Sequence, residues 1–280
     1  MRKRLSAIVL SVSMLGAAQG EVGASEPYDN IASPPGSYFV MYPQYYSADR
    51  LMDNNGDPVA ADPDAAIYQS TFKYNYFNKS WLPNTAMLTA FVPAGGMELR
   101  GDSDCGIGDL SLVGAYWFVD DPATKTWIGT RLQTVVPIGS YDQDRKANMG
   151  GNVWKFRPQL YGAKQVGKAL VELTAKYMIY TENTDTDTRL GNEVNLESYA
   201  GYFLRPDLLL GGHLNHTFGE EKTVAGVTVP DSGVRTWQAG ASLFKNFGGG
   251  FSALVEVLSD FATKNCLEGT NVMMRLSWKL

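Results

Sequence analysis

The two histidines are the residues with the clearest capacity for chemistry, because an imidazole can act as a catalytic base or as a metal ligand. His213 and His216 lie three residues apart in a segment with the alternation of a strand, which places them on opposite faces and prevents them from holding one metal ion. A hydrolytic base also needs a serine beside it. Gly211 and Asn215 flank His213 on its own face, so a serine would have to come from a neighbouring strand. The sequence therefore predicts no catalytic residue, no metal site and, without a phosphate-cradling loop, no cofactor.

Charged side chains at every second position form a second group with chemical capacity. In residues 127–138, for example, Arg131 and Gln133 alternate with the apolar Ile128 and Leu132. Side chains two residues apart share one face of a strand, so such segments have one polar face and one apolar face. The residues that we assign to the polar face as a candidate lining are Lys73, Arg131, Gln133, Lys155, Arg157, Glu172, Lys176 and Arg275.

About twelve long segments of this kind position these residues, and their connections fall into two length classes. Turns of a few residues, as at 166–168, alternate with long polar loops. The long loops are expected at 49–64, 94–106, 139–152, 181–193 and 219–233, with one more around Cys266. Strands of about ten residues match the roughly 9 to 11 that a tilted strand needs to cross a bilayer. The pattern predicts an all-β fold, a single antiparallel transmembrane β-barrel with short periplasmic turns and long extracellular loops. A soluble β-sandwich would have shorter strands.

The polar faces of such a barrel point into its lumen, and two interpretations remain open for them. Twelve strands about 4.8 Å apart and tilted by about 40° close at a backbone radius of roughly 12 Å, which side chains narrow to a small pore or block. In the first interpretation the mixed charges line a water path that selects small polar or anionic aromatic solutes. In the second, opposite charges such as Arg157 and Glu172 form an internal salt-bridge network that plugs the lumen.

The N-terminus predicts how the chain reaches a membrane. Three basic residues at positions 2–4 precede an apolar run at 5–15 and a stretch of small residues, which is the pattern of a secretory signal peptide. We expect cleavage after Gly20 or Ala24, so that residues 1–24 form the signal peptide and residues 25–280 the barrel. The apolar run is shorter than the roughly 20 residues of a spanning helix. The expected location is the bacterial outer membrane, with its lipid and lipopolysaccharide as the surroundings.

The charge of the chain argues against nucleic acid as a partner. The formal charge is −5 over 280 residues, and it becomes −8 once residues 1–20, with their three basic side chains, are set aside. A nucleic-acid-binding surface is basic instead. The charge gives no information about the oligomeric state.

Two further groups of residues suggest specific features of the loops and the mouth. Cys105 and Cys266 both fall in predicted extracellular loops, and two thiols in an exported protein are a candidate disulfide. Unpaired thiols are the alternative. Aromatic residues crowd both faces of the first strand, where they could form a vestibule for an aromatic solute: Tyr38, Phe39, Tyr45 and Tyr46. Other aromatic residues fit the interfacial girdles of a barrel.

Several different short motifs are spread over most of the chain after the predicted signal peptide. They are Gly36 to Phe39, Tyr45 to Leu51, Gly106 to Asp109, Pro137 to Asp142 with Arg145, Asn148, Gly150, Asn152, Trp154 and Phe156, and Gly191 to Glu193 with Gly201 and Tyr202. The Pro-Ile-Gly-Ser-Tyr-Asp segment at 137–142 is the most specific of them. Together they resemble the outer-membrane family named for the meta-pathway of phenol degradation. The resemblance implies a barrel that passes hydrophobic or aromatic compounds into the cell, and it carries no residue-level transport motif.

The sequence thus favours an outer-membrane channel or transporter-like barrel for small hydrophobic or aromatic compounds. A closed structural or adhesive barrel is the first alternative, and its function would depend on acidic loops such as 49–64. A lipid hydrolase is the remote alternative, since an outer-membrane phospholipase is also a twelve-stranded barrel. The missing serine beside His213 on its own strand argues against an enzyme.

Overall fold

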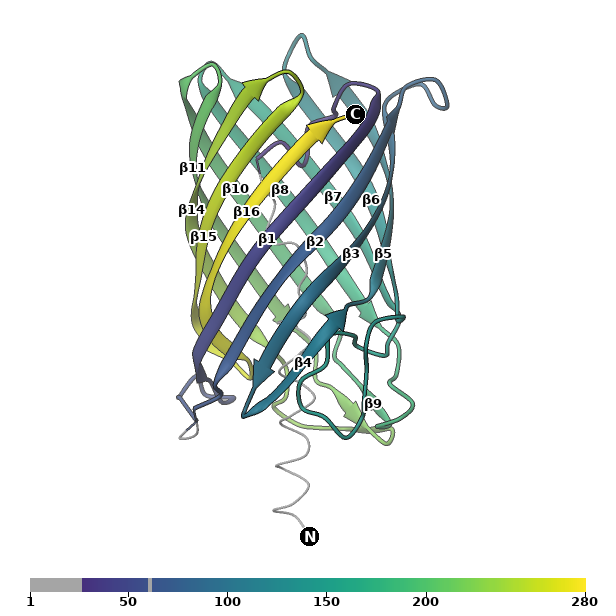
Figure 1. The fold of residues 1–280 in the computed structure, drawn as a ribbon, viewed down its shortest axis with the longest axis vertical. Coiled ribbons are helices and arrows are strands. Elements are labelled where there is room, and N and C mark those ends of the chain that lie inside the picture. Colours follow the sequence, from purple (N-terminus) through teal and green to yellow (C-terminus); the bar gives the residue numbers. More distant parts are fainter. Residues whose placement is uncertain (1–26, 60–61) are drawn as a thin grey trace.

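The described residues of the computed structural model, 27–59 and 62–280, form a closed antiparallel β-barrel (Figure 1). The twelve strands of its wall are β1 (Gly36–Leu51), β2 (Ala65–Asn78), β3 (Ala86–Leu99), β5 (Leu110–Asp121), β6 (Thr126–Val136), β7 (Lys155–Val166), β8 (Ala169–Tyr180), β10 (Glu193–Arg205), β11 (Leu208–Gly219), β14 (Arg235–Gly248), β15 (Phe251–Lys264) and β16 (Leu267–Lys279). The barrel closes where β1 pairs with β16, because every other wall strand pairs with its neighbours in the sequence. The predicted fold is therefore confirmed, while the predicted signal peptide at 1–24 lies outside the described residues.

Strand alternation divides the wall into a polar or buried inner face and an apolar outer face. In β8, Leu170, Glu172 and Thr174 are buried inside the barrel, whereas Val171 and Leu173 are exposed on the outside. An apolar outer surface of this kind is typical of a transmembrane barrel, because a soluble protein rarely exposes so large an apolar area. Within the described residues, no helix is long and apolar enough to span a membrane.

The two ends of the barrel differ in their connections. At the turn end, uppermost in Figure 1, the connections at 122–125, 167–168, 206–207 and 249–250 are short, and the last strand ends there at Lys279. At the loop end the connections at 52–64, 137–154, 181–192 and 220–234 are long, and short strands occur among them: β9 (Thr188–Arg189), β12 (Thr223–Val224) and β13 (Val227–Thr228). Four of the six long loops predicted from the sequence are therefore long connections in the structure.

Two of the predicted loops are wrong. The predicted loop at 94–106 is a hairpin, because β3 continues to Leu99 and pairs with β4 (Asp102–Ile107) through a turn in which Arg100 and Gly101 have positive φ. The predicted loop around Cys266 is a two-residue turn at 265–266 between β15 and β16. In both cases the strands extend beyond the apolar part of the wall. Their polar and glycine residues there have the composition of a loop.

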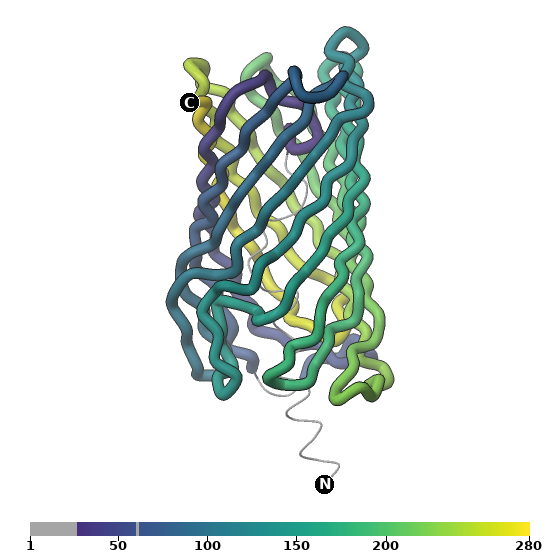
Figure 2. The backbone as a smooth tube through the Cα atoms, turned by 90° about the vertical axis from the view of Figure 1, so that its right-hand side faces the viewer, coloured from purple at the N-terminus to yellow at the C-terminus, as the bar shows by residue number. Residues whose placement is uncertain are grey.

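Two segments outside the wall fill parts of the lumen. Residues 27–35 lie inside the barrel near the turn end, as the purple segment within the tube of Figure 2 shows. There Ile31 packs against two apolar clusters, one that includes Tyr42 and Phe244 and one that includes Phe77 and Trp117. At the loop end, the connection between β6 and β7 contributes buried residues to a third cluster. The lumen is thus partly filled from both ends.

Candidate functional site: a basic cavity in the lumen

A cavity of about 520 Å³ extends from the middle of the lumen to the turn end. Its volume lies within the range of roughly 300 to 1,000 Å³ that is usual for small-molecule sites. Gly248, Gly250 and Lys279 line it at the turn end, and Gln133 and Gln159 line it toward the middle of the barrel. The inner walls of a closed barrel and the N-terminal segment thus enclose a space of ligand size.

Basic side chains dominate the charge of this cavity. Among the described residues that line it, the basic ones are Lys73, Arg131, Arg157, Lys176, Arg275 and Lys279, and the one acidic residue is Asp29. They meet there because odd-numbered residues of β2, β6, β7 and β16 and even-numbered residues of β8 point into the lumen. Such an excess of positive charge in a confined space attracts anions.

The eight candidate lining residues of the sequence all face the lumen. Six of them line the cavity, namely Lys73, Arg131, Gln133, Arg157, Lys176 and Arg275. Lys155 and Glu172 are buried in the lumen outside the cavity lining. One of the sequence-predicted charges does form an ion pair within the wall, since Lys176 contacts Glu197 on β10. Arg157 donates a hydrogen bond of 3.4 Å to Gln133, and Glu172 binds the N-terminal segment, so the suggested pairing of Arg157 with Glu172 is replaced by these contacts.

Glu172 and Arg131 hold the N-terminal segment inside the barrel. The carboxylate of Glu172 accepts hydrogen bonds from the backbone N–H of Tyr28, at 2.6 Å, and of Asn30, at 3.0 Å. Arg131 donates to the carbonyl oxygen of Asp29 and, at 3.0 Å, to the side-chain oxygen of Asn30. Because Glu172 is fully buried, these two N–H groups replace the water that its carboxylate loses on folding.

The carboxylate of Asp29 lies against the basic side of the cavity. Its Oδ1 is 3.4 Å from Nη1 of Arg275, whose Nη2 donates a hydrogen bond of 2.9 Å to the carbonyl of Pro27. Burial raises the pKa of Asp29, but the positive charges of Lys73, Arg275 and Arg131 outweigh this effect and hold the pKa below its ordinary value. The carboxylate is therefore ionised, and 26% of its side chain stays exposed in the lumen.

Aromatic rings form much of the remaining wall of the cavity. Arg275 lies over the ring of Phe244 with 5.6 Å to its centroid, and Lys73 lies 5.7 Å from the centroid of Tyr42. Phe77, Phe91 and Phe251 add apolar surface. The site can therefore receive a small solute that combines a negative charge with an apolar ring.

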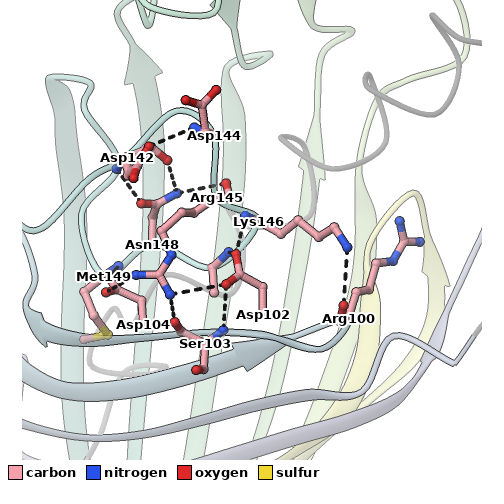
Figure 3. A network of polar contacts seen from close by, with 11 residues as sticks. Arg100, Asp102, Ser103, Asp104, Asp142, Asp144, Arg145, Lys146, Asn148 and Met149 are labelled. Atoms are coloured by element: carbon pink, nitrogen blue, oxygen red, sulfur yellow. Dashed lines mark hydrogen bonds and ion pairs between the residues drawn. The ribbon is translucent and has the colours of Figure 1, made fainter.

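The loop between β6 and β7 covers the other mouth, and two carboxylates of β4 clamp it there (Figure 3). Asp102 accepts hydrogen bonds from the backbone N–H of Lys146, at 2.7 Å, and of Ala147, at 3.2 Å, and Asp104 accepts one of 2.8 Å from Met149. Arg145 reaches back to both carboxylates, at 3.2 and 3.3 Å. Ala147 and Met149 are thereby buried in an apolar cluster with inward residues of β1, β2, β3 and β16.

A third carboxylate continues this clamp along the same segment. Asp109 accepts hydrogen bonds from the backbone N–H of Gly139, at 3.0 Å, and of Gly151, at 2.9 Å. Gly139 and Gly150 touch through their backbones, since a Cβ placed on Gly139 would lie 2.8 Å from the Cα of Gly150. The motifs at 106–109 and 137–142 therefore meet in this loop and hold its backbone together.

The four aromatic residues proposed as a vestibule do not come together. Tyr38 faces the lumen and packs on Phe77, while Tyr46 lies eight residues along β1, roughly 26 Å away at strand spacing, and donates a hydrogen bond to Asp260. Phe39 stacks on Trp278, and 51% of Tyr45 is exposed. The vestibule prediction is wrong, because alternation sends neighbouring residues of one strand to opposite faces.

The candidate disulfide is also not formed. Cys105 and Cys266 are free thiols in the structure. Cys105 is exposed on β4 opposite Gly96, whereas Cys266 is buried at the turn before β16, with its Sγ 3.7 Å from the carbonyl oxygen of Arg235. The burial of Cys266 raises the pKa of its thiol.

The serine that the sequence could not place lies beside His213. Nε2 of His213 is 2.8 Å from Oγ of Ser242 on β14 and 3.1 Å from Oε2 of Glu256 on β15. A catalytic relay needs the acid on the other ring nitrogen, and here both neighbours approach Nε2. The side chains of His213 and Glu256 are also fully buried, so a substrate has no access to them. The geometry is that of a buried polar cluster of the wall.

A metal site is the second kind of site that the histidines could have formed. No three His, Cys, Asp or Glu side chains in the described ranges, 27–59 and 62–280, are placed to hold a metal ion. His216 lies on the outer face of β11, where its ring stacks on Trp237 at 4.0 Å.

Comparison with solved structures shows the same fold in bacterial outer-membrane proteins. An outer membrane channel from Pseudomonas putida F1 has a TM-score of 0.85 and 22% identity, covering 91% of this chain and 100% of that one. The transport unit of the autotransporter AIDA-I from Escherichia coli has a TM-score of 0.58 and 10% identity, covering 96% of this chain and 98% of its own. The porin KdgM, solved in complex with disordered oligogalacturonate, has a TM-score of 0.51 and 10% identity, covering 86% of this chain and 99% of its own.

Comparison of the sequence itself gives the family. The comparison with curated protein sequences gives no match. The family model described as "Putative MetA-pathway of phenol degradation" matches residues 48–276, which is most of the chain and nearly all of the barrel wall. The chain therefore belongs to this family.

Proposed function

We propose that the protein is a gated outer-membrane channel for small hydrophobic or aromatic compounds. One observation carries the proposal: the lumen contains a cavity of about 520 Å³ with basic and aromatic walls. Segments that belong to no wall strand lie at both ends of this lumen, and they are held by hydrogen bonds and ion pairs. Such contacts can be broken and remade, whereas the wall cannot open without the loss of a strand ladder.

The fold supports a specific placement in the cell. In this proposal residues 1–24 are a signal peptide that is cleaved after Gly20 or Ala24, the apolar outer face contacts outer-membrane lipid, and the loop end lies outside, next to lipopolysaccharide. The turn end then faces the periplasm. A solute would pass the loop between β6 and β7 first and residues 27–35 last.

Single-channel conductance of the refolded protein in a planar bilayer tests the proposal, with phenol added on one side. We expect rare, discrete openings that phenol alters. Arg145→Ala removes both ion pairs of the loop clamp and should increase the open probability at least several-fold. Arg205→Ala is the matched control, because Arg205 lies exposed at the turn end and pairs with Asp207.

Uptake of radiolabelled phenol into vesicles gives the second readout. If the wild type and Arg145→Ala are both silent in conductance and in uptake, although each runs as a folded barrel on an unheated gel, the channel proposal is wrong. A closed structural or adhesive barrel with binding carried by its loops would then replace it.

A further inference from the structure

We propose that the lumenal cavity is a binding site for aromatic carboxylates, in which the solute carboxylate replaces that of Asp29 and thereby releases the N-terminal segment. The inference rests on the proposed function, because it names the solute class of that channel. Three features of the cavity carry it, namely its charge, the position of Asp29 and its aromatic rings.

The charge of the cavity calls for an anion. Six basic side chains line it against one carboxylate, within the part of the chain that the structure describes. Three acidic groups nearby already have partners: Glu172 accepts two backbone N–H bonds, Glu197 contacts Lys176, and Glu193 is hydrogen-bonded to Tyr180. Cations that lie close together in a lumen repel one another, and a mobile counter-ion lowers their electrostatic energy.

Asp29 already shows how a carboxylate sits at this site. It belongs to the N-terminal segment and not to the wall, yet its Oδ1 lies 3.4 Å from the guanidinium of Arg275. Arg131, the next basic group, binds the backbone carbonyl of the same residue. A guanidinium presents parallel N–H donors that fit any carboxylate, so a free one can take the place of the tethered one.

The rings beside these cations select an aromatic acid over an inorganic anion. Phe244 lies under Arg275, Tyr42 lies beside Lys73, and Phe91 and Phe251 line the same cavity. A benzoate with its carboxylate at Arg275 therefore places its ring against aromatic walls, where contacts between rings stabilise it beyond the gain from buried area. A neutral analogue gains only the ring contacts.

Displacement of Asp29 also links binding to gating. The segment that carries it is fixed by Glu172, Arg131, Trp117 and Arg275 and narrows the turn end of the lumen. A carboxylate that takes over Arg275 removes one of these anchors. The solute then weakens the obstacle to its own exit.

Calorimetric titration of the refolded full-length mature protein with benzoate and with benzamide, its neutral counterpart of equal size, tests the site. We expect benzoate to bind at least 10-fold more tightly than benzamide. Asp29→Asn should tighten benzoate binding at least 5-fold, because the competing charge is gone, and Arg275→Gln should weaken it at least 10-fold. Asp49→Asn and Arg205→Gln change exposed groups of the same types and should leave it unaltered.

Equal binding of benzoate and benzamide, or an Asp29→Asn variant that binds benzoate no more tightly than the wild type, overturns the inference. The same preparations are then used for phenol conductance, which separates the two proposals. If the protein conducts but does not prefer the carboxylate, the channel proposal stands and the proposed binding site is wrong. If the predicted binding pattern is found in a barrel that shows neither conductance nor uptake, the binding site stands and the channel proposal is wrong.

Discussion

The indole N–H of Trp117 on β5 donates a hydrogen bond of 2.8 Å to the backbone carbonyl of Asn30, and so ties the wall to a segment that belongs to no strand. Trp117 is fully buried and packs against Phe77 and Tyr161. The contact joins residues 87 positions apart in the sequence, which makes the position of the N-terminal segment a property of the closed barrel.

Trp117→Phe should loosen residues 27–35. The change removes the hydrogen bond and leaves a buried carbonyl without this donor, at a cost of about 1 to 3 kcal/mol. A cysteine at Ser33, in a background with Cys105→Ser, reports the opening through its rate of maleimide labelling, which should rise several-fold. Trp127→Phe is the matched control, because it removes a buried indole of the same cluster that makes no hydrogen bond to the segment. Equal labelling rates in the two variants would contradict the prediction.

Glu172→Gln should loosen the same segment from the other side. The carboxylate accepts from two backbone N–H groups, whereas an amide offers one oxygen and turns its NH₂ toward the second donor. We expect faster labelling at position 33 and a higher open probability in the bilayer. Glu98→Gln on the exposed outer part of β3 should change neither quantity. A labelling rate like that of the wild type would show that Glu172 does not hold the segment.

Strand alternation explains why much of the wall could be predicted from the sequence. The direction of a side chain in a strand depends only on its parity, so the inward position of Arg131 and the outward position of Leu132 follow from neighbouring residues alone. Whether these inward residues contact a solute stays a prediction. Parity also rules out the vestibule, since Tyr45 and Tyr46 cannot both face the lumen.

The parts that the sequence could not give depend on contacts between distant segments. The hairpin of β14 and β15 sets Ser242 opposite Glu256, but the pairing of β11 with β14 that brings His213 beside them spans the long connection at 220–234. Residues 27–35 have no periodicity, and their partners Trp117 and Glu172 lie far along the chain, in β5 and β8. The hairpin of β3 and β4 was hidden for a different reason: its polar and glycine residues have the composition of a loop.

Gly139→Ala should break the loop over the barrel mouth. A Cβ there would lie 2.7 Å from the carbonyl carbon of Gly108 and 2.8 Å from the Cα of Gly150, and both obstacles are backbone. We expect a loss of about 1 to 3 kcal/mol from overpacking, measured by urea unfolding in detergent. Channel opening should also become more frequent. Gly114→Ala on β5 is the control, because its new Cβ meets nothing within 4 Å and should leave both measurements unchanged.

Acid should open the loop end through Asp102. Hydrogen bonds from the backbone N–H of Ala147 and Lys146 hold the pKa of its carboxyl below the ordinary value. Because the folded state binds the proton less readily than the released state, the clamp is fully present above the ordinary pKa of about 3.9 and is lost as the pH falls through the lower folded-state pKa. We expect the open probability to rise in that acid range.

Asp102→Asn tests this assignment, because an amide cannot lose or gain the proton and accepts the two N–H bonds more weakly. The variant should show a raised open probability at neutral pH and a much smaller response to acid. Asp144→Asn alters an exposed carboxyl of the clamped loop itself and should keep the full response. If Asp102→Asn retains the acid response of the wild type, another group must release the loop, and the clamp by Asp102 is not what closes this mouth.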